Sequence, residues 1–201
     1  SPRADEAELG ARFLKDGFIV APAEDQAALT ELRAATAAAA AKALGVDVPG
    51  DVAGFLDRIH ERVDPTKLNG LRLAVIDHLL NMPTFRSLYF ACGRTLVEAI
   101  VGNELAIQRN IGFSIQLPGD DSSLLPLHSD TWGSECSPFE VVLWIPLVDC
   151  QRTKSMWLLP PAKDRVWRAR VGEFQATGIE SLYKAVEADT TWIDIRYGDV
   201  L

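Results

Sequence analysis

A histidine and an aspartate stand two residues apart in the segment PLHSDTWGS, residues 126–134. Side chains two apart on an extended strand share a face, so His128 and Asp130 can bind one metal ion together. An imidazole and a carboxylate are two of the three protein ligands in a 2-His-1-carboxylate site, which holds Fe(II) and leaves coordination positions open. The pair therefore predicts half of an iron site. The alternative interpretation is that His128 and Asp130 lie in a hydrogen-bonded turn and bind no metal. The chain has only three histidines.

An alternating stretch precedes this pair and is the first element expected to position it. Between residues 107 and 117 the odd positions are apolar except for Arg109. The even positions are polar or small: Gln108, Asn110, Gly112, Ser114 and Gln116. Successive side chains of a strand point to opposite faces. The polar face lines a pocket if the strand belongs to a barrel with an internal site, and it faces water if the strand covers the outside of a sandwich.

The first hundred residues predict helices that pack beside the strands. Apolar residues recur at helical intervals in the five segments 4–17, 24–45, 51–63, 65–81 and 83–102. Gly17 and Gly45 are the expected C-caps of the first two helices. A short strand is expected at 18–22, closed by Pro22. The alanine-rich run inside 24–45 has a strong helix propensity and suits a packed helix better than a disordered segment.

From residue 104 onward the sequence changes to strand-like runs separated by Pro, Gly, Asp and Ser. The runs are 104–118, 125–130, 139–148, 155–160, 190–195 and 199–201. Short strands at this spacing indicate an antiparallel sandwich or barrel. We therefore expect one α+β domain over residues 1–201, in which a mainly helical flank at 1–103 packs on barrel strands at 104–201.

Composition and charge narrow the classes of partner. The chain has 201 residues, 48% of them hydrophobic, which is sufficient for one domain with its own core. A net charge of −8 argues against nucleic acid and anionic membranes, because both are bound through Lys and Arg. No apolar run reaches the roughly 18 residues of a membrane-spanning helix. Cys92, Cys136 and Cys150 have neither metal-site nor disulfide spacing, so we expect a reduced, cytoplasmic protein.

Longer segments around the His-x-Asp pair resemble one enzyme family. The block LPLHSDTWGSECSPFEVVLWIPLVDCQRTKSMWLLP, residues 125–160, resembles the core of the phytanoyl-CoA dioxygenase-like 2-oxoglutarate/Fe(II) oxygenases. It is most similar to the branch found in bacterial carbohydrate and aminoglycoside biosynthesis clusters. The family's His-x-Asp strand matches His128 and Asp130, and its next strand matches VVLWIPLVD at 141–149. The segment YGDVL at 197–201 resembles the family's Gly-Asp turn, and RFLKDGFIVAPAEDQAALTELRAA resembles its opening strand and helix.

The resemblance implies a double-stranded β-helix, which is a jelly-roll or cupin-like barrel, flanked by N-terminal helices. It implies Fe(II) and 2-oxoglutarate as cofactors and O₂ as a co-substrate. In such a reaction 2-oxoglutarate loses CO₂ to give succinate while a C–H bond of the substrate is oxidised. The implied substrate is a sugar-containing or other small polar biosynthetic intermediate, such as a sugar nucleotide. Related halogenases have a small residue where this chain has Asp130, so hydroxylation or another oxidation is favoured over halogenation.

Five residues beside the metal ligands receive expected roles. Gln116, Ser114 and Trp144 are candidates for contacting 2-oxoglutarate, and Trp132 and Arg109 are candidates for contacting the substrate. Each has a structural alternative. Ser114 and Gln116 suit a solvated strand face, and Arg109 suits a surface ion pair. Trp132 and Trp144 suit positions in the core or at its rim.

Two functional residues of the family have no match in the chain. The family's distal histidine follows the Gly-Asp turn, and an arginine that binds 2-oxoglutarate follows that histidine, so both are expected beyond residue 201. His60 and His78 lie on predicted helices and are much less favoured as ligands. Because residues 199–201 look like the start of a strand, we expect the natural protein to continue. The 201 residues themselves are then expected to bind metal weakly and to show little or no turnover.

Two other functions stay open at this level. A non-catalytic cupin-like barrel would bind or scaffold other molecules without completing the metal site. A cupin-type metal enzyme, such as an isomerase, would use His128 and Asp130 without 2-oxoglutarate. Residues beyond 201 discriminate among the three: a histidine followed by an arginine supports the oxygenase, a histidine without the arginine supports the cupin enzyme, and neither supports the scaffold.

Overall fold

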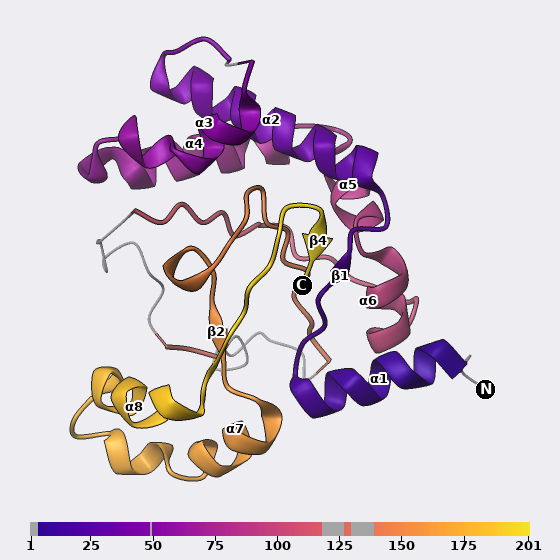
Figure 1. Cartoon of the computed structure of the whole chain (residues 1–201), viewed down its shortest axis with the longest axis vertical. Helices are drawn as coiled ribbons and strands as arrows, with labels where there is room; N and C mark the ends of the chain where they lie inside the picture. Colours follow the sequence, from indigo (N-terminus) through magenta and orange to yellow (C-terminus); the bar gives the residue numbers. More distant parts are fainter. Residues whose placement is uncertain (1–3, 49, 118–126, 130–138) are drawn as a thin grey trace.

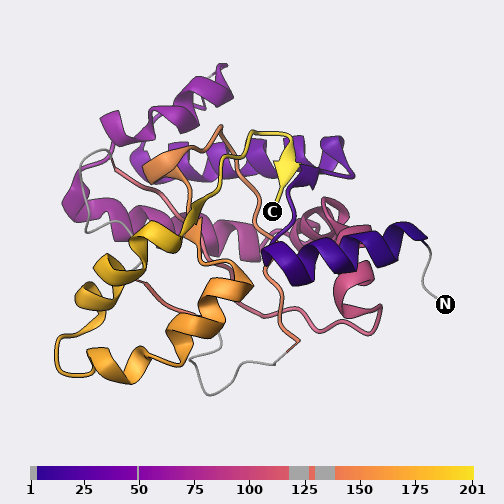
Figure 2. The same cartoon turned by 60° about the horizontal axis from the view of Figure 1, so that its bottom comes forward.

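Helices dominate the first half of the chain, and extended segments with further helices form the second half. A computed structural model describes residues 4–48, 50–117, 127–129 and 139–201. In Figure 1, α2, α3 and α4 form a layer at the top and α7 and α8 lie at the bottom, with the extended segments between them. In Figure 2, turned by 60°, the orange and yellow helices α7 and α8 again lie apart from the purple helices.

The bounds of the elements follow the chain in order. The α-helices are α1 (Ala4–Asp16), α2 (Gln26–Leu44), α3 (Val52–Asp57), α4 (Leu68–Leu80), α5 (Phe85–Ala91), α6 (Arg94–Val101), α7 (Pro161–Arg168) and α8 (Ile179–Val186). Short 3₁₀ turns are η1 (Ile59–Glu61), η2 (Pro65–Lys67), η5 (Arg152–Lys154), η6 (Val171–Phe174) and η7 (Glu187–Asp189). The strands are β1 (Ala21–Pro22), β2 (Trp157–Leu158), β3 (Thr191–Trp192) and β4 (Asp199–Val200).

Helix α2 begins and ends where its sequence predicts. The Asp25 carboxylate accepts a hydrogen bond from the backbone N–H of Ala28 at 2.9 Å, which satisfies one of the free donors of the first turn. Gly45 has a left-handed backbone with φ of 68° and closes the helix as a C-cap. Gly17, with φ of 82°, ends α1 in the same way. The predicted C-caps are therefore confirmed.

The main core lies on one side of α2, where α4 and α5 pack against it. The buried residues of α2 are Ala28, Leu29, Leu32, Thr36, Ala37, Ala39, Ala40 and Ala41. Small side chains on this face let the neighbouring helices approach closely, and burial of the remaining apolar groups from α3, α4 and α5 drives the packing. The alanine run is thus part of a packed interface, as the sequence predicts.

The segment 83–102 forms two helices instead of the single helix predicted. The break falls at Cys92 and Gly93, between α5 and α6. The Cys92 carbonyl accepts from the backbone N–H of Glu24 at 2.9 Å. The Glu24 carboxylate in turn accepts from the backbone N–H groups of Thr95 and Leu96, both at 3.1 Å, and caps α6. The loop that contains Glu24 therefore breaks the segment 83–102, for which the local sequence pattern predicts one continuous helix.

The described strands are short and form two antiparallel pairs. β1 pairs with β4, with Ala21 opposite Val200. β2 pairs with β3, with Trp157 opposite Trp192. Within the described residues these pairs do not close into a barrel, so the jelly-roll fold stays a prediction, while the mixed helix and sheet content is observed.

The alternating stretch 107–117 is extended but belongs to no strand pair among the residues that the structure describes. Its apolar positions from Ile111 to Leu117 pack on the main core, and Ile115 among them is buried, whereas Ile107 is exposed. Its carbonyl groups are bound by helix side chains: Arg86 donates to the carbonyls of Gln108 at 2.9 Å and Arg109 at 2.6 Å. Arg72 of α4 donates to the carbonyl of Ile115. Side chains of α4 and α5 thus donate hydrogen bonds to carbonyl groups of this segment, as the backbone of a neighbouring strand would do in a sheet.

Helices also occupy 161–189, for which the sequence patterns used above predict no element. Pro161 opens α7, where its missing N–H costs nothing. Trp157 of β2 stacks on Tyr183 of α8, with ring centroids 5.2 Å apart. The indole N–H of Trp167 donates to the Asp189 carboxylate at 2.8 Å. The α7–α8 unit therefore packs beside the β2–β3 pair.

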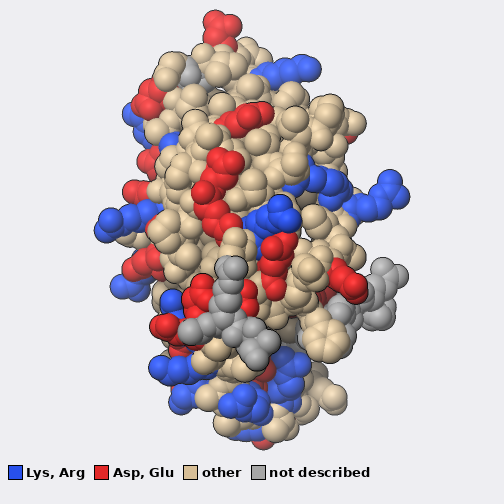
Figure 3. Space-filling model, turned by 90° about the vertical axis from the view of Figure 1, so that its right-hand side faces the viewer, with Lys and Arg blue, Asp and Glu red and all other residues tan. Residues whose placement is uncertain are grey.

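Charged side chains of both signs are interspersed over the face shown in Figure 3, and Lys and Arg gather at its lower end. Three cations of α7 and the turn after it are paired with carboxylates: Lys163 with Asp189 at 2.6 Å, Arg168 with Asp164 at 3.1 Å, and Arg170 with Glu173 at 2.9 Å. Exposed pairs of this kind contribute about 1 kcal/mol or less. Among the helices in the described part of the chain, none combines the length and the apolar character needed to span a bilayer.

Candidate functional site

His128 is the part of the predicted metal pair that the structure describes. Its side chain is exposed, so an ion in solution can reach the imidazole, which is a suitable ligand for iron. Asp130 and Trp132 lie outside the described residues. Across the described ranges, no cluster of three or more His, Cys, Asp or Glu side chains is placed to hold a metal. His60 lies in the 3₁₀ turn η1 and His78 lies in the helix α4, each within a segment for which the sequence predicts a helix.

Two segments quoted for the family resemblance lie side by side, although about fifty residues separate them. Trp144 and Leu201 exchange a pair of backbone hydrogen bonds at 2.7 and 3.0 Å. Cys150 and Ile195 exchange another pair at 2.8 and 3.0 Å, in an antiparallel bridge. The segment 141–149 therefore meets the segment 197–201, which the sequence could suggest only through resemblance.

Trp144 packs in a second hydrophobic cluster beneath this pairing. The cluster is built on the buried residues Cys150, Ile193 and Ile195, and Trp144 is among the partly buried side chains around them. A half-buried indole in this position stabilises the junction of the two segments through apolar contact. Its role toward 2-oxoglutarate stays a prediction.

The polar positions of the alternating stretch face different surroundings. Ser114 is exposed, and Arg109 is exposed as well. Gln116 is half-buried, and its amide Nε2 donates to the carbonyl of Ser155 at 3.5 Å. Gln116 is thus the described candidate that points toward the strands rather than into solvent.

Ser155 is a buried polar residue that sequence reasoning missed. A serine in a turn between two strand-like runs is expected to face solvent, yet Ser155 is 6% exposed. Its hydroxyl is buried and has no hydrogen-bond partner in the structure. Such a group costs free energy unless a water or ligand satisfies it. No signal in the local sequence distinguishes it from an exposed serine.

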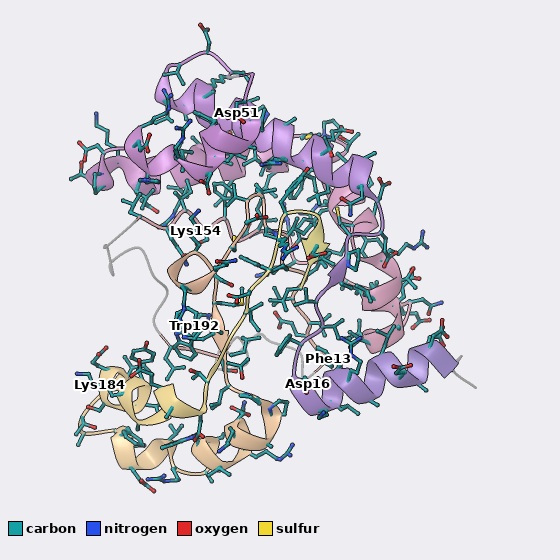
Figure 4. All side chains as sticks on the ribbon, viewed as in Figure 1. Phe13, Asp16, Asp51, Lys154, Lys184 and Trp192 are labelled. Atoms are coloured by element: carbon teal, nitrogen blue, oxygen red, sulfur yellow. The ribbon has the colours of Figure 1, made fainter. Side chains whose placement is uncertain are left out.

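Lys154 anchors the same turn to the helical layer. Its Nζ lies 2.5 Å from the Asp57 carboxylate of α3, and both side chains are about half exposed. Figure 4 shows Lys154 between the upper helices and the strands that lead to Trp192. The ion pair therefore connects the turn before β2 with the layer formed by α2, α3 and α4.

Cys92 and Cys150 are buried free thiols. Burial raises the pKa of each thiol to about 11, because the thiolate is poorly solvated there. Cys136 lies outside the described residues. Since these folded-state pKa values exceed the ordinary value of 9.0, the two thiols stabilise the fold below about pH 9, and this contribution is lost as the pH rises toward 11.

We predict that maleimide at pH 8 leaves Cys92 and Cys150 unmodified in the folded protein. Maleimide reacts with a thiolate that it can reach. Burial lowers the fraction of thiolate and also blocks access of the reagent. Peptide mass spectrometry after labelling, with a sample unfolded in guanidinium chloride as the control, measures the modification at each cysteine. Rapid labelling of Cys150 without denaturant would show that the second hydrophobic cluster is open to solvent.

Comparisons of this chain with protein-family models, with curated proteins and with solved structures found no match.

Proposed function

We propose that the protein is a 2-oxoglutarate- and Fe(II)-dependent oxygenase that acts on a small polar, sugar-containing intermediate in the cytoplasm. The observation that carries the proposal is the pairing of the segment 141–149 with the segment 197–201, downstream of His128. The family resemblance includes these same segments. Residues that contribute to one site must lie close together in the folded protein, and these two segments do so.

The proposed jelly-roll fold receives support from the way the strands pair. Each antiparallel pair joins segments that are distant in sequence: β2 with β3, and β1 with β4. Antiparallel strands joined by long connections are typical of two-sheet Greek-key folds, whereas a meander pairs consecutive strands through short turns. The long connection between β2 and β3 contains α7 and α8.

In the proposed site His128 and Asp130 would bind the iron. The exposed imidazole of His128 fits this role. When bound, Fe(II) and 2-oxoglutarate together supply the activation of O₂ for oxidation of a substrate C–H bond. Gln116 and Ser114 would donate hydrogen bonds that orient the co-substrate, and Trp144 would provide an apolar wall that excludes water. Trp132 and Arg109 contact the substrate.

Anaerobic titration of the full-length protein with Fe(II) in the presence of 2-oxoglutarate tests the proposal. We expect a weak visible charge-transfer band that saturates with one iron per chain and is lost when 2-oxoglutarate is omitted. A folded full-length protein that gives no band would contradict the oxygenase proposal. Iron binding that is independent of 2-oxoglutarate would instead favour a cupin-type metal enzyme.

A further inference from the structure

Three side chains of α2 contact the turn that leads to β4. Gln26, Thr30 and Arg33 follow each other at intervals of four and three residues, so they lie on one face of the helix. The Gln26 amide donates to the Gly198 carbonyl at 2.8 Å. The Thr30 hydroxyl lies 3.4 Å from the Tyr197 hydroxyl, and the Arg33 guanidinium lies 3.9 Å from the centroid of the Tyr197 ring. In Figure 1 this turn lies directly below α2.

The backbone that carries the Tyr197 ring is held in place from two sides. The Tyr197 N–H donates to Oδ1 of Asp149 at 2.9 Å. The carbonyl of the next residue, Gly198, also accepts from the Ala23 N–H at 2.8 Å. Gly198 has φ of 106°, a conformation that glycine adopts without strain. The ring and the Arg33 guanidinium beside it are therefore positioned before any ligand binds, which lowers the entropic cost of binding.

Arg33 carries a charge that no carboxylate neutralises within the described residues. Its side chain is half-buried, and its Nε is buried without a hydrogen-bond partner. The ion pairs of the described chain leave it out as well. A partly buried charge without a partner is unfavourable, because it loses hydration and gains no opposite charge. An anion bound from solution would supply that charge.

Other arginines that lie near aromatic rings differ from Arg33 in this respect. Arg94 and Arg170 are each neutralised by a glutamate three or four residues along the same segment. Arg62 is exposed to water and lies 5.9 Å from the centroid of the Phe55 ring. Among these contacts in the described part of the chain, Arg33 alone combines partial burial with an unpaired charge.

The donors beside Arg33 suit an oxyanion with more than two oxygens. A guanidinium binds two oxygens at once through its fork of N–H groups. The Thr30 hydroxyl donates to the Gln26 carbonyl at 2.8 Å, so its proton is already used. The Tyr197 hydroxyl then keeps a proton that it can donate to a ligand, because its contact with Thr30 is long. A phosphate can serve both the fork and the phenol, whereas the fork takes up both oxygens of a carboxylate.

We propose that Arg33 and Tyr197 form a binding site for the phosphate group of a small molecule. The inference goes beyond the oxygenase proposal and does not depend on it, since the site involves neither His128 nor iron. A sugar phosphate and a nucleotide both present such a group. Arg33 supplies the charge and the fork, and Tyr197 fixes the guanidinium with its ring and donates from its hydroxyl.

Titration of the protein with inorganic phosphate at constant ionic strength tests the site, with the NMR signal of the Arg33 Nε–H as the readout. This N–H is buried, so its proton is shielded from exchange with water. We expect a saturable shift of the signal with phosphate and no shift with chloride. Separate titrations with glucose 1-phosphate and uridine diphosphate show, by the tighter binding of one, whether a sugar or a nucleoside carries the phosphate.

Two variants remove single features of the site, and the Gly198 amide signal reports their phosphate affinity. Arg33→Lys keeps the charge without the fork and is expected to weaken phosphate binding at least about 10-fold. Tyr197→Phe keeps the ring without the hydroxyl and is expected to weaken it about 10-fold. Arg62→Lys makes the same substitution at the exposed arginine near Phe55 and is the matched control, expected to stay within about twofold of wild type.

Three results would overturn the inference. Chloride that shifts the Arg33 signal as phosphate does would show screening instead of binding. Acetate that binds as tightly as phosphate would refute the assignment to phosphate. Wild-type affinity in Arg33→Lys would refute the role of the fork. If Arg33→Lys does not fold, Tyr197→Phe decides the test, because it leaves the arginine and the ring in place. None of these results affects the charge-transfer titration, so failure here leaves the oxygenase proposal standing.

Discussion

The change His128→Ala is expected to eliminate the charge-transfer band of the full-length protein and to weaken Fe(II) binding by more than about 100-fold. Loss of a residue that merely supports a metal ligand weakens binding about 10- to 100-fold, so loss of a ligand exceeds that range. Because the His128 side chain is exposed, its removal leaves no cavity in the core. The midpoint of thermal unfolding without metal is expected to be unchanged.

His78→Ala is the matched control for this experiment, since His78 is also an exposed histidine and lies on α4. We expect it to keep the wild-type band and affinity. Asp130→Ala is expected to reproduce the loss seen in His128→Ala. If the His128 and Asp130 variants both retain the band, the metal assignment is wrong, whatever the activity of the protein.

The change Ala40→Leu is expected to lower the free energy of unfolding by about 1–3 kcal/mol. Ala40 has no exposed surface and lies on the face of α2 that packs on α4 and α5. The three added carbons of leucine have no space there, so either the helices separate or side chains leave their preferred rotamers. Urea unfolding followed by circular dichroism measures the change.

Ala34→Leu on the exposed side of α2 provides the control, because it makes the same substitution in the same helix. Alanine and leucine differ little in helix propensity, so the control is expected to change the stability by no more than about 0.5 kcal/mol. Equal effects at positions 34 and 40 would show that the buried alanine face is loosely packed and that the alanine run reflects composition alone.

The N-terminal helices could be predicted because their signals are local. Asp25 and Gly45 bound α2 through hydrogen bonds and backbone conformations that involve their own neighbours. The break at Gly93 could not be predicted, because it depends on Glu24, about seventy residues away, and on Leu143. A Cβ at Gly93 would lie 2.7 Å from a methyl group of Leu143, a contact that no local pattern encodes.

The extended half shows the same limit for strands. Alternation separates a core-facing side from an exposed side only over residues 111–115, where Ile115 is buried and Ser114 is exposed, while Ile107 is exposed despite its apolar side chain. Alternation does not specify what binds the backbone, and here Arg72 and Arg86 do so in place of a strand. The helices within 161–189 are not predicted by the strand-like runs that precede and follow them.

The candidate site divides in a similar way. The spacing of His128 and Asp130 is visible in the sequence and defines a testable chemistry. The bond from Tyr197 to Asp149 and the burial of the Ser155 hydroxyl are products of tertiary pairing. The family resemblance includes the segments that contain Asp149 and Tyr197, but it does not predict the contact between these two residues.

The pairing of β1 with β4 has a consequence for the order in which the protein matures on the ribosome. β1 is translated at residues 21–22, whereas its partner is translated at 199–200. At synthesis rates of about 5–20 residues per second, β1 stays unpaired for on the order of 10 s or more until β4 has been synthesised. During this interval its backbone donors and acceptors are open to chaperones or to other nascent chains. Docking of the N-terminal strand is therefore expected to be a late step, even though the helices that follow it can form early.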